Sequence, residues 1–126
     1  MSYSNFIMKV RKSIVKKSYA VKFEFWEAKK RLAWAYLYII FQDRHQEPYA
    51  LLENVYVEKE YRDRGLGTKL INLAISEAKK RGCYKIIGTS KKTNIGAHRF
   101  YERFGIKKIG YEFRLDLKKS KPQQRD

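Results

Sequence analysis

Apolar and polar residues alternate in several stretches of this chain with the period of two that indicates β-strands. Between residues 19 and 25 every second residue is Tyr, Val or Phe, which predicts a strand with one buried face. Residues 6–15 predict an earlier strand with a basic outer face, and residues 32–41 are apolar on both faces, as in a central strand. After a polar loop, residues 49–57 predict a fourth strand.

A different spacing of apolar residues predicts two helices in the second half of the chain. From residue 66 to residue 81 the apolar positions recur every three or four residues, and Gly82 follows as a helix stop. A shorter helix is expected at about residues 95–104, with Thr93 or Asn94 capping its start.

Two further strands are expected around the shorter helix, at residues 83–89 and in the alternating stretch 109–117. Residues 118–126 are polar and basic, as in a flexible tail. The early strands follow one another through short turns, which favours antiparallel pairing, whereas the strand–helix–strand unit at 51–89 favours a parallel pair. The predicted fold is α/β, an α+β mixed sheet of about six strands with two main helices, in a single domain over residues 1–126.

The stretch from Arg62 to Thr68, with the sequence RDRGLGT, joins the fourth strand to the long helix. A glycine loop before a helix binds anions, because the first N–H groups of a helix have no intrahelical partner and glycine lets a phosphate approach. Thr68 precedes Lys69, the reverse of a Walker A loop, and Leu70 stands where a dinucleotide motif needs glycine. The loop therefore predicts a phosphorylated cofactor of another class.

Further motifs resemble those of the GNAT superfamily of acetyl-CoA-dependent N-acetyltransferases. The Arg-x-x-Gly-x-Gly spelling from Arg62 is similar to the pyrophosphate loop of that family, and residues 53–57 and 82–86 resemble its fourth and fifth strands. The Asn…Ala…Phe-Tyr-Glu…Gly signature of the family is matched by Asn94, Ala97, Phe100, Tyr101, Glu102 and Gly105. The resemblance runs from about residue 51 to about residue 117 and implies a GNAT-like fold.

The resemblance implies acetyl-CoA as the acetyl donor. Main-chain groups of the fourth strand would hold the thioester and the pantetheine arm, the glycine loop would wrap the pyrophosphate, and an asparagine would contact the pantetheine arm. The implied cofactor-binding residues are Val55, Tyr56, Val57, Arg62, Asp63, Arg64, Gly65, Leu66, Gly67, Thr68, Asn94 and Tyr101. Asn94 serves equally well as a helix cap, and one residue can fill both roles.

The family also implies direct transfer of the acetyl group to a primary amine within a ternary complex. Tyr101 would be the general acid, since a phenol with a pKa of about 10 can protonate a thiolate whose conjugate thiol has a pKa of about 8.5. Glu53, or a water relay, would be the base that deprotonates the amine. The alternatives are a tyrosine that only packs and a strand carboxylate that only pairs with a cation. Cys83 and His98 are not expected to form a covalent intermediate.

The chain is unusually basic, with 29 Lys+Arg against 13 Asp+Glu and a formal charge of +16. Such a surface attracts polyanions, so an alternative function is an RNA- or ribosome-associated binding protein that retains an acyl-CoA site. Solubility or host composition explains the charge equally well. No apolar run reaches the roughly 18 residues of a membrane span, and one cysteine with two histidines argues against a metal site. A cytoplasmic protein is expected.

The chain departs from the GNAT pattern in two places. Most members place one or two helices between the first two strands, where they form much of the acceptor pocket, and this chain has no room for them. Many members also end in two strands, whereas one is expected here, which leaves an edge where the partner of a homodimer would pair. Both departures leave the amine acceptor open, and they suggest a large substrate or a pocket completed by a second subunit.

Overall fold

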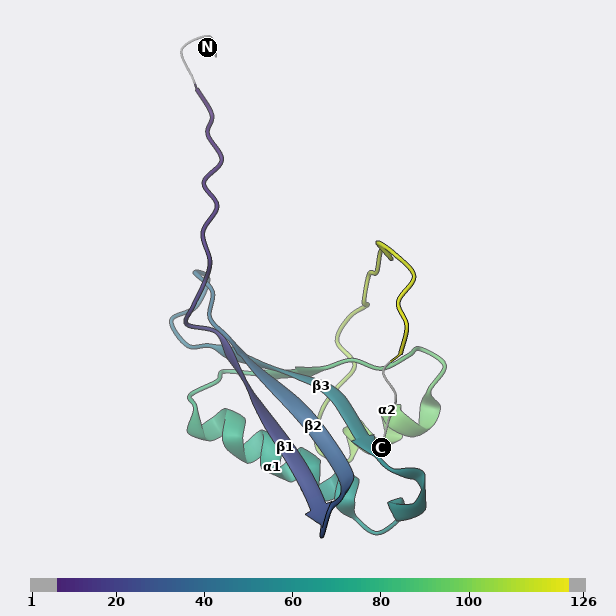
Figure 1. The fold of residues 1–126 in the computed structure, drawn as a ribbon. Coiled ribbons are helices and arrows are strands. Elements are labelled where there is room, and N and C mark those ends of the chain that lie inside the picture. The colour runs from purple at the N-terminus through teal and green to yellow at the C-terminus, as the bar shows by residue number, and fades with distance from the viewer. Residues whose placement is uncertain (1–6, 123–126) are drawn as a thin grey trace.

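The computed structural model describes residues 7–122, in which a four-stranded mixed sheet carries two helices (Figure 1). The sheet has the order β1-β2-β3-β4, with the first two pairs antiparallel and the β3–β4 pair parallel. In chain order the elements are β1 (Tyr19–Glu27), β2 (Lys30–Ile40), β3 (Tyr49–Val57), the 3₁₀ turn η1 (Lys59–Tyr61), α1 (Leu66–Lys80), β4 (Ile86–Gly88) and α2 (Ile95–Glu102). The predicted mixed sheet with two helices is confirmed.

Short connections and long antiparallel ladders build the first part of the sheet. Only Ala28 and Lys29 separate β1 from β2, and the two strands pair from Tyr19 opposite Ile39 to the hairpin turn. On the other side of β2, Leu37 lies opposite Leu52 of β3. Because side chains alternate between the faces of a strand, this register gathers the small and aliphatic residues of β2 and β3 on one face.

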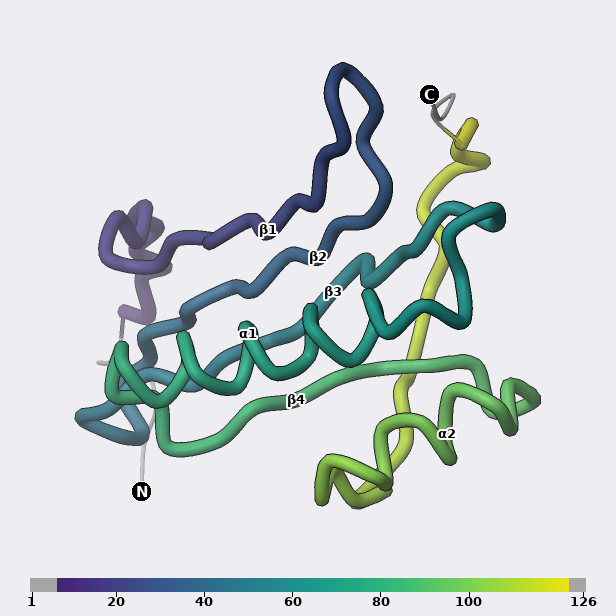
Figure 2. The backbone as a smooth tube through the Cα atoms, turned by 90° about the horizontal axis from the view of Figure 1, so that it is seen from below, coloured from purple at the N-terminus to yellow at the C-terminus, as the bar shows by residue number. Residues whose placement is uncertain are grey.

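That face is covered by α1, which crosses the sheet diagonally (Figures 1 and 2). Alanines on both elements let the helix axis come close to the strands, so that the larger aliphatic side chains pack between them. The core consists of Ala33, Ala35, Leu37, Ile39, Ala50 and Leu52 from the sheet and Leu70, Ile71, Ala74 and Ala78 from α1. The shorter helix α2 lies beside β4 and adds the partly buried Phe100 and Tyr101 to this core, as does Phe104 just after the helix (Figure 2).

The prediction of about six strands is wrong in number, because two of the expected strands do not form. Residues 7–15 and 109–117 have no strand structure, and the remaining residue of the first predicted strand, Phe6, lies outside the described residues. A strand persists through hydrogen bonds to a neighbour, and neither segment has a neighbouring strand among the described residues. The fifth predicted strand is also shorter than expected, and it is confined to Ile86–Gly88.

Other boundaries agree with the sequence within one or two residues. The long helix ends at Lys80, and the residue after its C-cap is Gly82, which has the left-handed φ of 77° that a helix stop requires. The shorter helix ends at Glu102 and has Asn94 as its N-cap. Residues 118–122 have no regular structure, and the rest of the predicted tail lies outside the described residues.

The core makes a prediction about the stability of the fold. Leu70→Ala removes a side chain that is 0% exposed and should lower the free energy of unfolding by about 2–5 kcal/mol, through lost burial and the cavity left behind. Leu73→Ala is the matched control, because Leu73 lies on the same helix but is 43% exposed. Urea denaturation followed by circular dichroism measures both variants. Equal losses would show that α1 does not pack through the face described here.

Candidate active site

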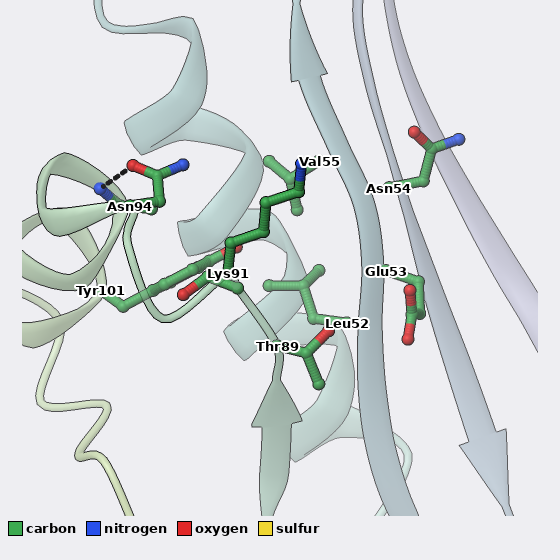
Figure 3. Close-up of a pocket in the computed structure, with 10 residues that line it drawn as sticks. Leu52, Glu53, Asn54, Val55, Thr89, Lys91, Asn94 and Tyr101 are labelled. Carbon is green, nitrogen blue, oxygen red and sulfur yellow. Dashed lines mark hydrogen bonds between the residues drawn. The ribbon is translucent and has the colours of Figure 1, made fainter. Parts of the chain in front are cut away.

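A cavity of about 260 Å³ opens where β3 and β4 cease to pair. The parallel ladder contains only three residue pairs and ends with Leu52 opposite Gly88. Beyond that point β3 forms one wall, and the connection after β4 together with α2 forms the other (Figure 3). We call this cavity the cleft.

Four of the predicted catalytic and cofactor-binding residues line the cleft together, and Ala97 of the signature lines it as well. Glu53 and Val55 come from β3, whereas Asn94 and Tyr101 come from the start and the last turn of α2 (Figure 3). About forty residues of chain separate the two pairs, so only the fold brings them to one place. Tyr56 and Val57 lie further along β3, and neither is among the residues that line the cleft.

A β-bulge in β3 shapes the cleft wall. Trp34 of β2 lies opposite Tyr56, but Tyr36, two residues later, lies opposite Glu53, so β3 contains one extra residue at this point. Within the bulge Asn54 has a left-handed φ of 53°. Asparagine tolerates this conformation better than most residues. An asparagine inside a predicted strand was the available sequence signal of the bulge, and no bulge was predicted from it.

The electrostatic environment of Tyr101 keeps its phenol neutral. Burial raises the pKa of Tyr101 above its usual value of about 10, and the negative charge of Glu53 raises that pKa further. The ring lies against Gly88, at 4.0 Å from the position that a Cβ would take there, which is ordinary van der Waals distance. A neutral phenol in a cleft is a proton donor.

Asn94 has the structural role that its sequence position predicted. Its Oδ1 accepts a hydrogen bond from the backbone N–H of Ala97 at 3.0 Å, which caps the N-terminus of α2. The amide NH₂ group of the same side chain points away from this bond (Figure 3). It leaves a donor on a residue that lines the cleft.

The glycine loop is held at the end of β3 by a side-chain bond. Arg62 donates from Nε to the carbonyl oxygen of Val57 at 2.9 Å. Arg64 is the second arginine of the loop. The backbone then turns through Asp63 and Gly65, both with positive φ, of 62° and 82°. Such angles are ordinary for glycine and uncommon for other residues.

The loop ends in a helix start without a side-chain cap. Gly65 is the N-cap of α1 and has no side chain, so no side chain accepts from the first-turn N–H groups of Leu66, Gly67 and Thr68. A Cβ at Gly65 would meet nothing within 4 Å, so the space above it is open. At Gly67 a Cβ would lie 3.4 Å from the ring of Phe100, so the missing side chain there lets α2 pack against α1. These features suit an anionic guest at the helix start.

Several cleft residues were not singled out by the sequence analysis. They are Leu52, Asn54, Thr89, Ser90 and Lys91. Lys91 is the basic member of this set, and its carbonyl oxygen contacts His98 Nε2 at 2.9 Å. The positions of Thr89, Ser90 and Lys91 depend on how the chain runs between β4 and α2, which no local motif encodes.

Cys83 and His98 do not form a catalytic pair in this structure. Burial raises the pKa of the Cys83 thiol, which opposes formation of a thiolate nucleophile. The cysteine precedes β4, at the end of that strand away from the cleft, whereas His98 lies on α2.

Residues 7–122 contain neither a cluster of metal ligands nor a helix that could span a membrane. Within this part of the chain no three His, Cys, Asp or Glu side chains gather in a way that would hold a metal ion. None of the helices described there has the length and apolar character needed to cross a membrane.

Comparisons with known proteins agree with this geometry. Residues 14–106 match the model of the acetyltransferase (GNAT) family, which is well over half of the chain. A curated relative, glucosamine 6-phosphate N-acetyltransferase of Trypanosoma brucei brucei, is 36% identical over 66 residues, which cover 52% of this chain and 43% of that protein. Streptothricin acetyltransferase A of Bacillus subtilis is 38% identical over 55 residues, or 44% of this chain and 32% of that protein.

Solved structures give the same result. The crystal structure of a Trypanosoma brucei acetyltransferase superposes with a TM-score of 0.66 at 30% identity, covering 71% of this chain and 62% of that one. The chain spans less than half the length of the two curated relatives, so the likeness concerns a shared part of those proteins. With the family model, the signature on α2 and the sheet in agreement, the chain belongs to the GNAT acetyltransferase family.

Proposed function

We propose that this protein transfers an acetyl group from acetyl-CoA to a primary amine. The observation that carries the proposal is the cleft, where Glu53 and Tyr101 from distant parts of the chain face a common space. Family membership supports the reaction class, and the uncapped start of α1 supports a phosphorylated donor. Acetyl-CoA combines a thioester with a polyanionic nucleotide end, so it suits both features.

The residues present fit acetyl-CoA at both of its ends. The N–H groups at the start of α1 would bind the pyrophosphate, assisted by Arg64. The main chain at Val55, next to the bulge, would hold the pantetheine arm and the thioester, with the free amide of Asn94 on the opposite wall. Tyr56 and Val57 would continue this main-chain contact toward the loop.

The proposed chemistry uses two proton transfers. The amine nitrogen attacks the thioester carbonyl carbon, a C–N bond forms and the C–S bond breaks. Glu53, directly or through water, takes the proton that the amine loses, and Tyr101 gives its phenolic proton to the departing thiolate. Main-chain N–H groups of β3 would stabilise the negative charge that develops on the carbonyl oxygen.

For the acceptor we propose an amine that also carries an anionic group, such as an amino sugar phosphate. One matched relative is named a glucosamine 6-phosphate N-acetyltransferase, Lys91 lines the cleft, and the chain carries a formal charge of +16. On the sheet face away from α1, Tyr36 lies opposite Glu53 and stacks with Tyr38 at 6.3 Å between ring centroids, which offers a platform next to the base.

The assay that identifies the acceptor is release of free thiol from acetyl-CoA over a panel of amines. The panel contains an amino sugar phosphate, the same sugar without phosphate, a polyamine, a lysine peptide and a peptide N-terminus. A faster reaction with the phosphorylated sugar than with its neutral analogue would support the proposal, and the reverse order would contradict it. Binding to RNA or to the ribosome stays a prediction that rests on charge alone.

The glycine loop makes a prediction about binding of the donor. Isothermal calorimetry should detect acetyl-CoA binding, and Arg64→Ala should weaken it by about fivefold, the scale of an exposed charge interaction that salt screens. Lys79→Ala, at the opposite end of α1, is the control for loss of one positive charge and should leave the affinity unchanged. Absence of binding at high micromolar acetyl-CoA would end the enzyme proposal.

Tyr101→Phe makes a prediction about the leaving group. Turnover should fall about 10²-fold, the scale of a lost general acid, while the affinity for acetyl-CoA stays similar. Because the pKa of Tyr101 is raised, the acid is fully present at pH 6–9, and turnover should be lost only as pH rises through that elevated pKa, above about 10. Tyr84→Phe, outside the cleft, is the control. Unchanged turnover in Tyr101→Phe would remove this residue from the mechanism.

Glu53→Gln makes a prediction about the base. At neutral pH kcat/KM should fall by about 10²-fold, because the attacking amine lacks an acceptor for the proton that it loses. The loss should shrink as pH rises through the pKa of the acceptor amine, above which the amine is neutral by itself. Glu102→Gln, an exposed carboxylate on α2, is the control. A pH-independent loss would indicate a structural role for Glu53.

A further inference from the structure

A second cavity, of about 450 Å³, lies at the opposite end of the β3–β4 ladder from the cleft. The cleft opens after Gly88, where the ladder ends, whereas Tyr49 and Lys85 of the second cavity precede the first pair, Ala50 opposite Ile86. The walls of the second cavity come from the β2–β3 loop, the start of β3 and the residues around the start of β4. No residue lines both cavities, so the second cavity is a separate site.

Backbone hydrogen bonds hold the walls of the second cavity together. The N–H of Tyr84 donates to the carbonyl oxygen of Pro48 at 3.0 Å, and the N–H of Ala50 donates to the carbonyl oxygen of Lys85 at 2.9 Å. Pro48 is buried, and its ring fixes the backbone where the loop enters β3. The fold itself therefore shapes the second cavity, as is usual for sites that bind small groups.

The second cavity is positively charged. Arg44 and Lys85 line it, and no carboxylate of the described residues does. Within residues 7–122 neither cation forms an ion pair, although Asp43 and Glu47 belong to the same loop as Arg44. Two such cations beside one hollow attract an anion, and the planar guanidinium group of arginine matches the oxygens of a phosphate.

Three aromatic rings lie beside these cations. The rings of His45 and Tyr84 pack with 4.2 Å between their centroids and 35° between their planes. The ammonium group of Lys85 lies 5.4 Å from the ring centroid of Tyr49 and 5.3 Å from that of Tyr84. Both His45 and Tyr84 are exposed, so a flat ligand can extend their stack. Gln42 adds an amide that can donate to and accept from the edge of such a ligand.

A basic segment of chain leaves the sheet beside the second cavity. Residues 7–18 extend away from the end of the sheet at which the β2–β3 loop lies (Figure 1). The N–H of Phe41, the residue before Gln42, donates to the hydroxyl of Ser18 at 2.9 Å, and the ammonium group of Lys17 lies 4.5 Å from the Phe41 ring centroid. We call residues 7–18 the basic arm. It contains no acid, and its cations are Lys9, Arg11, Lys12, Lys16 and Lys17.

We propose that the second cavity and the basic arm bind single-stranded nucleic acid, with one nucleotide in the cavity and the neighbouring phosphates along the arm. Stacking rings next to cations are the combination that binds unpaired bases and their phosphates. A free nucleotide would use the cavity alone, so the arm favours a strand. A duplex keeps its bases inside the stack and offers none to the cavity. The net charge gives such a partner no location, whereas the cavity and the arm give it one.

The ring of Tyr84 provides the first test. Fluorescence anisotropy of a labelled single-stranded RNA of about ten nucleotides, at about 0.15 M salt, measures its affinity for the full chain. Tyr84→Ala should weaken binding about tenfold, the scale of one lost stacking contact, whereas Tyr84→Phe keeps the ring and should bind normally. Circular dichroism checks that both variants are folded. Unchanged binding by folded Tyr84→Ala would overturn the proposal.

Reversal of a single charge locates the site. Lys85→Glu should weaken RNA binding about tenfold, because a phosphate contact becomes a repulsion. Lys29→Glu is the matched control, since Lys29 lies in the β1–β2 turn at the other end of the sheet. Arg64→Glu is the control for the start of α1, where the donor is proposed to bind. Equal losses in Lys85→Glu and in either control would overturn the proposal, because the RNA would then bind by general charge or at the start of α1.

Other ligands separate a strand from a free nucleotide and from a duplex. A mononucleotide should bind more weakly than the RNA, and the double substitution of Lys16 and Lys17 by Glu should weaken only the RNA. Equal affinity for the mononucleotide and the RNA would overturn the proposal, and so would equal affinity for a duplex of the same length. These titrations contain no acetyl-CoA, so their result stands whether or not the chain transfers an acetyl group.

Discussion

The short pairing of β3 with β4 is the constraint on which the candidate site depends. Three residue pairs are enough to place β4 in the sheet, and their end at Leu52 and Gly88 opens the cleft. A longer ladder would close the space between Glu53 and Tyr101 with strand backbone. The bulge at Asn54 acts in the same direction, because an extra residue on β3 turns its main chain away from regular pairing.

The core holds the two walls of the cleft in place. Ala33, Ala35 and Ala50 bring the sheet close to α1, and Gly67 brings α2 close to the start of α1 through Phe100. The same helix start carries the unsatisfied N–H groups that suit a phosphate. Packing and the proposed recognition of the cofactor therefore share one short stretch of chain, so substitutions in the glycine loop should affect both.

The sheet face without a helix layer and the apolar row at residues 109–117 both leave apolar surface unburied. A chain of 126 residues has limited apolar surface to bury, yet here five large apolar residues near its C-terminus remain in water. The acceptor side of the cleft is also open, because no helix of the described residues covers the sheet face at Tyr36 and Tyr38.

Local chemistry was sufficient to determine the parts of this protein that depend on near neighbours in sequence. Glycines at 65, 82 and 105, the apolar spacing of α1 and the cap at Asn94 fix the turns, the helices and their ends. The meeting of Glu53 with Tyr101, the inclusion of Lys91 and the bulge at Asn54 follow from tertiary register, which no local pattern contains. The alternating pattern at 7–15 and 109–117 likewise indicates only that these residues have the capacity to pair as strands. A strand also requires a neighbouring edge, and the fold decides where that edge lies.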